Sequence, residues 1–229
     1  YEYDRNFPNN LNQITDLPFA GPSLASIYVP EIKAILIFPR VGYISAYQPQ
    51  TNKLIRISQF VDLNATRLNV FRGQDTLYLL KENDLSARPT TQSELNSLAI
   101  SDLKVNFDSP CDANSCQANL QDTGIKIPRV GTIPYYKADG FIYFLGGNEN
   151  GVIQDTIIQV DPKDSTKSTV LDQNHKMTTP LAYAAYQRDE SGKRMYLFGG
   201  ITDANNTPYK KTLTFFADSS GLPRAGEED

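Results

Sequence analysis

The chain has 229 residues and a formal net charge of −4, from 22 basic and 26 acidic side chains. This length suits one large all-β domain or two small domains with a sizeable core. The basic residues do not cluster, which argues against a nucleic-acid-binding surface. No apolar run approaches the roughly 20 residues that cross a bilayer, so we expect no membrane insertion by this segment.

Short apolar runs, rich in Tyr and Phe and separated by turn residues, predict an all-β fold. A short strand is expected at 11–15, followed by a first unit of four antiparallel strands. A second, weaker unit has two apolar strands, a polar insertion at 81–94, and two further strands. The expected strands of these two units are 23–29, 34–38, 43–47, 53–57, 67–71, 76–80, 95–100 and 103–107.

The second half of the chain carries the clearest repeat. The third unit is expected to have four strands, and the fourth unit only three. A polar tail or linker at 218–229 follows a domain at 1–217. The expected strands are 131–137, 141–145, 156–160, 168–171, 181–187, 195–198 and 212–216.

Two apolar runs in these units end in a glycine pair, Gly146-Gly147 and Gly199-Gly200. Glycine adopts positive φ angles, so each pair lets the chain leave a crowded sheet without a Cβ clash. The recurrence of this pattern after roughly 50 residues indicates one supersecondary unit used several times.

The third and fourth units resemble the kelch repeat. In both units an apolar strand ends at the glycine pair and is followed by a variable loop and another apolar strand. Asp161-Pro162 follows that strand in the third unit, and Tyr47-Gln48-Pro49 occupies a similar place in the first. The resemblance covers residues 16–216. The chain departs from the family in having no Trp, and the second unit is the most divergent.

This resemblance implies a kelch-like β-propeller with about four visible four-stranded blades, as a small ring or as part of a longer one. Pairing of 11–15 with 212–216 would close a small ring. The alternative is another repeated β-meander, such as a different propeller class or a sandwich.

The sequence offers no catalytic, cofactor-binding or metal-binding set. The single histidine, His175, lies in a polar linker, where we expect a solvated side chain. The copper radical oxidases among kelch-like propellers need two histidine ligands. Oxygen ligands for a hard cation are available from Asn148, Glu149, Asn150 and Asp155, but we interpret this segment as a solvated loop.

Two features favour a secreted or cell-surface glycoprotein. Cys111 and Cys116 lie in a polar loop and are expected to form a disulfide, with two free thiols as the alternative. Asn64 and Asn205 begin glycosylation sequons, with Thr66 and Thr207 two residues downstream.

The function that we expect is non-catalytic recognition or scaffolding, with a protein or glycan partner bound by the loops after the second strands. These loops are 148–151, 202–207 and 39–42. Tyr135, Tyr136, Tyr183 and Tyr186 are more typical of sheet packing than of binding. The candidate contact residues are Asn148, Glu149, Asn150, Asp203 and Asn206.

Three alternatives stay open. The first is a hydrolase or lyase with an acidic or metal-binding cluster in its central channel. The second is a structural subunit of an extracellular assembly or filament, which would assemble or extend beyond this segment. The third is an intracellular kelch adaptor, which would have free cysteines and no glycan.

Overall fold

The computed structural model describes residues 2–3, 11–12, 23–63, 65–85, 88–103, 105–109, 118–136, 140–164, 166–188, 194–217 and 223–228. In these residues the chain is all-β, and its helical segments are the short 3-10 turns η1 (Pro30–Ile32) and η2 (Ile100–Asp102). None of the described helices is long and apolar enough to cross a membrane.

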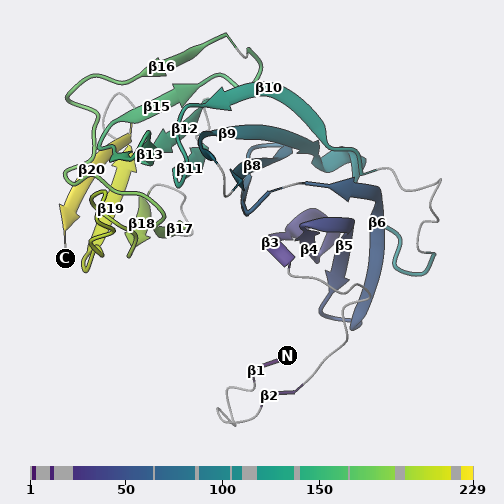
Figure 1. Ribbon diagram of the computed structural model, residues 1–229. Helices are drawn as coiled ribbons and strands as arrows, with labels where there is room; N and C mark the ends of the chain where they lie inside the picture. Colours follow the sequence, from purple (N-terminus) through teal and green to yellow (C-terminus); the bar gives the residue numbers. More distant parts are fainter. Residues whose placement is uncertain are drawn as a thin grey trace.

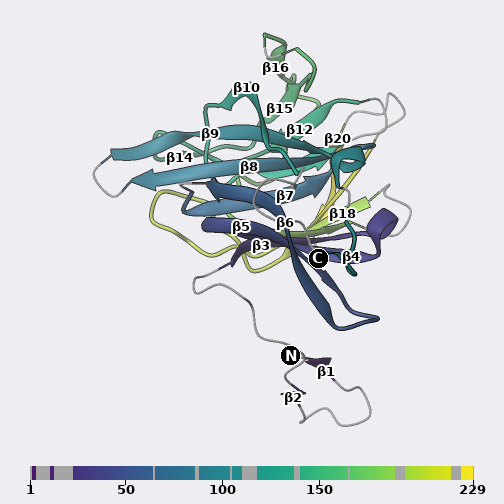
Figure 2. The same ribbon diagram turned by 90° about the vertical axis from the view of Figure 1, so that its right-hand side faces the viewer.

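Four antiparallel sheets, each of four strands, follow one another along the chain (Figures 1 and 2). In every sheet the strands lie in sequence order, as a simple meander. Sheet 1 contains β3 (Ser23–Val29), β4 (Ala34–Pro39), β5 (Val41–Gln48) and β6 (Lys53–Asp62). Sheet 2 contains β7 (Arg67–Arg72), β8 (Thr76–Leu85), β9 (Arg88–Ala99) and β10 (Gln121–Ile127).

Sheets 3 and 4 repeat this arrangement in the second half of the chain. Sheet 3 contains β11 (Ile133–Tyr136), β12 (Ile142–Leu145), β15 (Ile157–Val160) and β16 (Ser168–Val170). Sheet 4 contains β17 (Ala185–Arg188), β18 (Arg194–Phe198), β19 (Thr212–Ala217) and β20 (Pro223–Glu228). Two small ribbons pair β1 (Glu2–Tyr3) with β2 (Leu11–Asn12), and β13 (Asn148–Glu149) with β14 (Val152–Ile153).

The four sheets form an arc, in which each sheet lies beside the next one in the sequence (Figure 1). The first strands β3 and β7 are in contact, as are β7 and β11. Sheets 1 and 4 therefore stand at the two ends of the arc.

The hydrophobic core is divided into three clusters, and each cluster fills the space between two consecutive sheets. Residues of sheets 1 and 2 share the first cluster, which includes Leu36 and Leu79. The second joins sheets 2 and 3 and includes Leu80 and Phe144. The third joins sheets 3 and 4 through residues such as Leu145.

The second strands of the two middle sheets explain this division. In β8, Leu79 belongs to the cluster shared with sheet 1, and its neighbour Leu80 belongs to the cluster shared with sheet 3. In β12, Phe144 and Leu145 divide in the same way between sheets 2 and 4. Successive side chains point to opposite faces of a strand. A strand covered on both faces therefore needs an uninterrupted apolar run, as both strands have.

The strands expected for sheets 1 and 3 are confirmed, but four other expectations are wrong. The described residues of 81–94 are not an insertion, because 81–85 belong to β8 and 88–94 to β9, and these paired strands extend beyond β7 (Figure 2). The fourth strand of sheet 2 is β10 and not 103–107. Sheet 4 has a fourth strand, β20, which pairs with β19. The expected pairing of the segment at 11–15 with β19 is absent, because β2 pairs with β1.

Candidate binding surfaces at one end of the sheets and at their centre

In sheets 1 to 3, the second strand or the residue after it contacts the segment that leads into the next sheet. Three hydrogen bonds show this. Leu63 N–H donates to the Arg40 carbonyl at 3.0 Å, and Gly147 N–H donates to the Leu181 carbonyl at 2.9 Å. Between sheets 2 and 3, the Gly131 N–H donates to Glu82 Oε1 at 2.6 Å. We call this side of the molecule the glycine end. The loops after β12 and β18 leave from it. The loop expected at 39–42 is not present, because β4 ends at Pro39 and β5 begins at Val41.

Close packing at this end leaves no room for a Cβ at Gly146, Gly147 or Gly200, whereas no atom lies within 4 Å of a Cβ at Gly199. Gly147 has φ +97°, and a Cβ there would lie 2.5 Å from Thr132 Cγ2. Gly200 has φ +88°, and its Cβ would lie 2.5 Å from the Ala182 carbonyl oxygen. Gly146 and Gly199 also have positive φ angles. The predicted avoidance of a Cβ clash is thus confirmed for three of the four glycines, and for Gly199 only the positive φ angle is.

A buried arginine fixes the base of the loop that follows β12. The Arg129 side chain is only 4% exposed, and its Nε donates to Glu149 Oε2 at 3.0 Å. Its Nη1 donates to the carbonyls of Gly146 and Thr156, and its Nη2 donates to Thr156 Oγ1. Glu149 is thus a structural partner of Arg129 as well as a loop residue. Sequence reasoning missed Arg129.

A second buried charge, Glu82, lies in a cycle of contacts that joins sheets 2, 3 and 4. Its side chain is 3% exposed, and the nearest Arg67 nitrogen is 3.8 Å from Glu82 Oε2. The Gly131 carbonyl accepts a hydrogen bond from Tyr183 N–H at 2.8 Å. The Arg67 guanidinium lies 4.5 Å from the centroid of the Tyr183 ring. Burial raises the pKa of the Glu82 carboxyl above its ordinary value.

The loop after β12 is an ordered hairpin made by β13 and β14. Asn148 Oδ1 accepts a hydrogen bond from Gly151 N–H at 2.8 Å. Asn150 takes a left-handed backbone conformation with φ 53°. Val152 is an exposed apolar residue on this hairpin. The hairpin therefore offers an apolar and amide-bearing tip on a rigid base.

The loop after β18 is organised by Asp203. Its Oδ1 accepts hydrogen bonds from the N–H groups of Asn205 and Thr207, and its Oδ2 accepts one from Thr207 Oγ1 at 2.7 Å. The hydrogen bond from the Thr207 hydroxyl lowers the pKa of the Asp203 carboxyl. Asn205 and Asn206 are exposed on this loop, so the Asn205 sequon is open to solvent.

Other residues singled out from the sequence have separate places. Asn64, Cys111, Cys116 and the Tyr136 side chain lie outside the described residues. His175 Nδ1 is 2.8 Å from Asp172 Oδ1, and its side chain is only 15% exposed, so the expectation of a solvated histidine is wrong. The oxygen ligands considered for a cation are not assembled, because Glu149 pairs with Arg129 and Asp155 with Lys176. Among the described residues, no group of three or more His, Cys, Asp and Glu side chains could hold a metal ion.

The first strands of all four sheets contribute to one central pocket of about 300 Å³. Its polar residues include Arg72, which forms a two-pronged ion pair with Glu31, and Arg188, which lies 4.8 Å from the Tyr135 ring centroid. Burial raises the pKa of Tyr186 to about 12, so this phenol is neutral at pH 7. The lining residues are Ile27, Val70, Phe71, Arg72, Pro134, Tyr186, Gln187 and Arg188.

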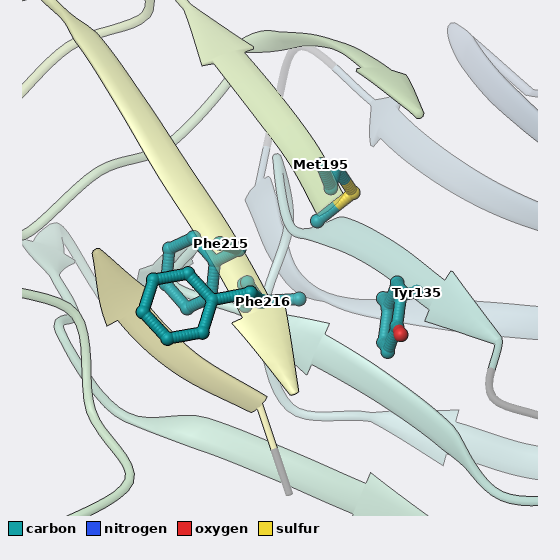
Figure 3. Close-up of a pocket in the computed structure, with 5 residues that line it drawn as sticks. Tyr135, Met195, Phe215 and Phe216 are labelled. Carbon is teal, nitrogen blue, oxygen red and sulfur yellow. The ribbon is translucent and has the colours of Figure 1, made fainter. Parts of the chain in front are cut away.

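A second, much smaller pocket lies between sheets 3 and 4 (Figure 3). Its volume is about 10 Å³, and its walls are apolar. A space this small holds at most one water, and apolar walls give a water no partners. We therefore assign it to imperfect core packing. Its lining residues are Tyr135, Leu145, Met195, Phe215 and Phe216.

Comparison of the chain with models of known protein families finds no match, and comparison with curated proteins finds none either. The fold and these surfaces thus define a class by architecture alone. The chain is an all-β protein built from several antiparallel sheets, with ordered loops at one end.

Proposed function

We propose that the chain is a kelch-like β-propeller, or a segment of one, that acts as a non-catalytic recognition module. Three observations support this reading. The four sheets are meanders in sequence order, their first strands line one pocket, and the glycine pairs end two of the second strands. In a propeller, four-stranded sheets surround a central channel in the same way.

The observation that carries the function is the common direction of the exit loops. Hydrogen bonds at Arg40, Glu82 and Gly147 connect this side of the second strands of sheets 1 to 3 with the segments that begin the following sheets. The hairpin 148–153 and the loop 201–208 emerge there from a rigid base. Loops on a rigid β scaffold are a common solution for recognition. We propose that this surface binds a protein or a glycan outside the cell.

The extracellular part of the proposal rests on the sequon at Asn205, which is exposed on the loop after β18. A sugar attached there would stand at the edge of the proposed surface and not in the core. The pairing of Cys111 with Cys116 remains part of the same proposal. Intact mass of the protein from its native source, with and without a glycosidase and a reductant, tests both modifications.

Binding is tested on an array of extracellular glycans and purified ectodomains, with the full chain as the probe. Val152→Glu and Ala204→Glu each add a charge at the tip of one exit loop, and both positions are exposed. Gln74→Glu adds the same side chain at the opposite end of the sheets, in the turn between β7 and β8. We expect the loop variants to weaken binding about tenfold or more, and the control to bind normally. No binding on the array, or binding that the loop variants leave intact, would contradict the proposal.

A further inference from the structure

The outward face of sheet 4 repeats the residues that other sheets bury against their neighbours. In β12, Tyr143 and Leu145 are buried against sheet 4, and Leu145 immediately precedes the glycine pair. In β18, Tyr196 and Phe198 occupy the same positions before Gly199-Gly200. Phe198 is nevertheless 45% exposed, because no described sheet follows sheet 4 in the arc.

The strand register confirms that these side chains point away from sheet 3. Met195 and Leu197 belong to the cluster shared by sheets 3 and 4. Tyr196 and Phe198 alternate with them and therefore lie on the other face. The outward face of sheet 4 thus carries two aromatic residues, Tyr196 and Phe198.

The outward face of sheet 1 is the counterpart at the other end of the arc. Leu36 and Phe38 of β4 are buried against sheet 2, so Ile35 and Ile37 point outward. Tyr28 lies opposite Ile35 in the register and is 50% exposed. In the middle of the molecule, Tyr78 and Leu80 of one sheet share a cluster with Ile142 and Phe144 of the next. Ile35 and Ile37 hold the positions that correspond to Ile142 and Phe144.

We propose that these two faces form a joint between copies of the chain, in which sheet 4 of one copy packs on sheet 1 of a second copy. Tyr196 and Phe198 would meet Ile35 and Ile37 as Tyr78 and Leu80 meet Ile142 and Phe144. The joint continues the sheet-to-sheet packing that already occurs three times within the chain. Because one chain carries both halves, the contact is heterologous. Other copies of the chain can therefore cover both faces, one copy with its sheet 1 and another with its sheet 4.

The mass of the full chain in solution, measured by sedimentation from low to high micromolar concentration, tests the joint. We expect reversible formation of species of at least two chains. Phe198→Lys and Tyr28→Lys each place a charge on one exposed face and should weaken association about a hundredfold. Val170→Lys is the matched control, because Val170 is 54% exposed on the edge strand β16 and belongs to neither face. Circular dichroism verifies that each variant is folded.

A mixture of the two face variants gives the sharpest result. Phe198→Lys leaves the face of sheet 1 intact, and Tyr28→Lys leaves the face of sheet 4 intact. Each variant alone should be monomeric, whereas an equimolar mixture should form a one-to-one dimer through the single remaining joint. A wild-type chain that stays monomeric, or a mixture that stays monomeric, overturns the proposal and assigns these faces to another occupant. Val152→Glu in the exit loop should leave association unchanged, which separates this joint from the recognition surface.

Discussion

Glu82 Oε1 and the Gly131 backbone nitrogen are 2.6 Å apart, and their hydrogen bond joins β8 to the segment that begins sheet 3. At the corresponding place between sheets 3 and 4, the backbone of Gly147 makes the contact with Leu181. A buried side chain and a backbone group thus serve the same structural role in successive repeats.

Replacement of Glu82 tests this role. Glu82→Ala removes the acceptor and leaves the buried Gly131 N–H without its partner, so the free energy of unfolding should fall by about 2 kcal/mol. Glu82→Gln keeps an oxygen acceptor in the same place and should lose less than half as much. Urea unfolding measures both values. Equal losses for the two variants would show that the hydrogen bond is not the important contact.

The pH dependence of stability provides a second test of Glu82. Burial raises its pKa above the ordinary 4.5 in the folded state. Between the unfolded and folded pKa values, the folded protein holds a proton that the unfolded chain has released. The free energy of unfolding therefore falls as the pH rises from about 4.5 through this window. Glu82→Gln should lack this component, and a wild-type stability that rises relative to the variant would contradict the raised pKa.

The glycine pairs predict unequal effects of a single added methyl group. Gly147→Ala combines a positive φ angle with a Cβ that would lie 2.5 Å from Thr132 Cγ2. We expect a loss of about 3 kcal/mol in the free energy of unfolding. Gly151→Ala also has a positive φ angle, but no atom lies within 4 Å of its Cβ. It should lose only about 1 kcal/mol. Similar losses would argue against close packing at Gly147.

The loop after β18 should depend on one carboxylate. Asp203→Ala removes acceptors for the N–H groups of Asn205 and Thr207 and for the Thr207 hydroxyl. We expect faster amide hydrogen exchange at these two residues and no change in the 148–153 hairpin. Unchanged exchange in the 201–208 loop would show that Asp203 does not organise it.

Sheets 1 and 3 were predictable because most of their strands are rich in apolar residues and their turns carry Gly, Pro or Asn. The strands that were missed, β10 and β20, lie at sheet edges and contain several polar residues. Their position follows from backbone pairing with β9 and β19, which composition does not reveal. Edge strands are often charged because this discourages pairing with other chains.

The candidate surface was predictable only in part. The exit loops and the glycine pairs follow from the sequence pattern itself. Arg129 and Glu82 could not be recognised, because a charged residue in a sequence is usually solvated. Their burial depends on partners far along the chain, such as Thr156 for Arg129 and Gly131 for Glu82.

The alternate packing of second-strand residues between neighbouring sheets is the central claim, and Phe144 tests it most directly. Its ring packs edge-to-face on Phe71 of sheet 2, with the centroids 6.4 Å apart. Nuclear Overhauser effects measured by NMR should therefore connect the Phe144 ring with Phe71, and the Leu145 methyl groups with residues of sheet 4. Effects that connect Phe144 with Met195 or Leu197, and none with Phe71, would contradict the assigned faces and with them the order of the sheets.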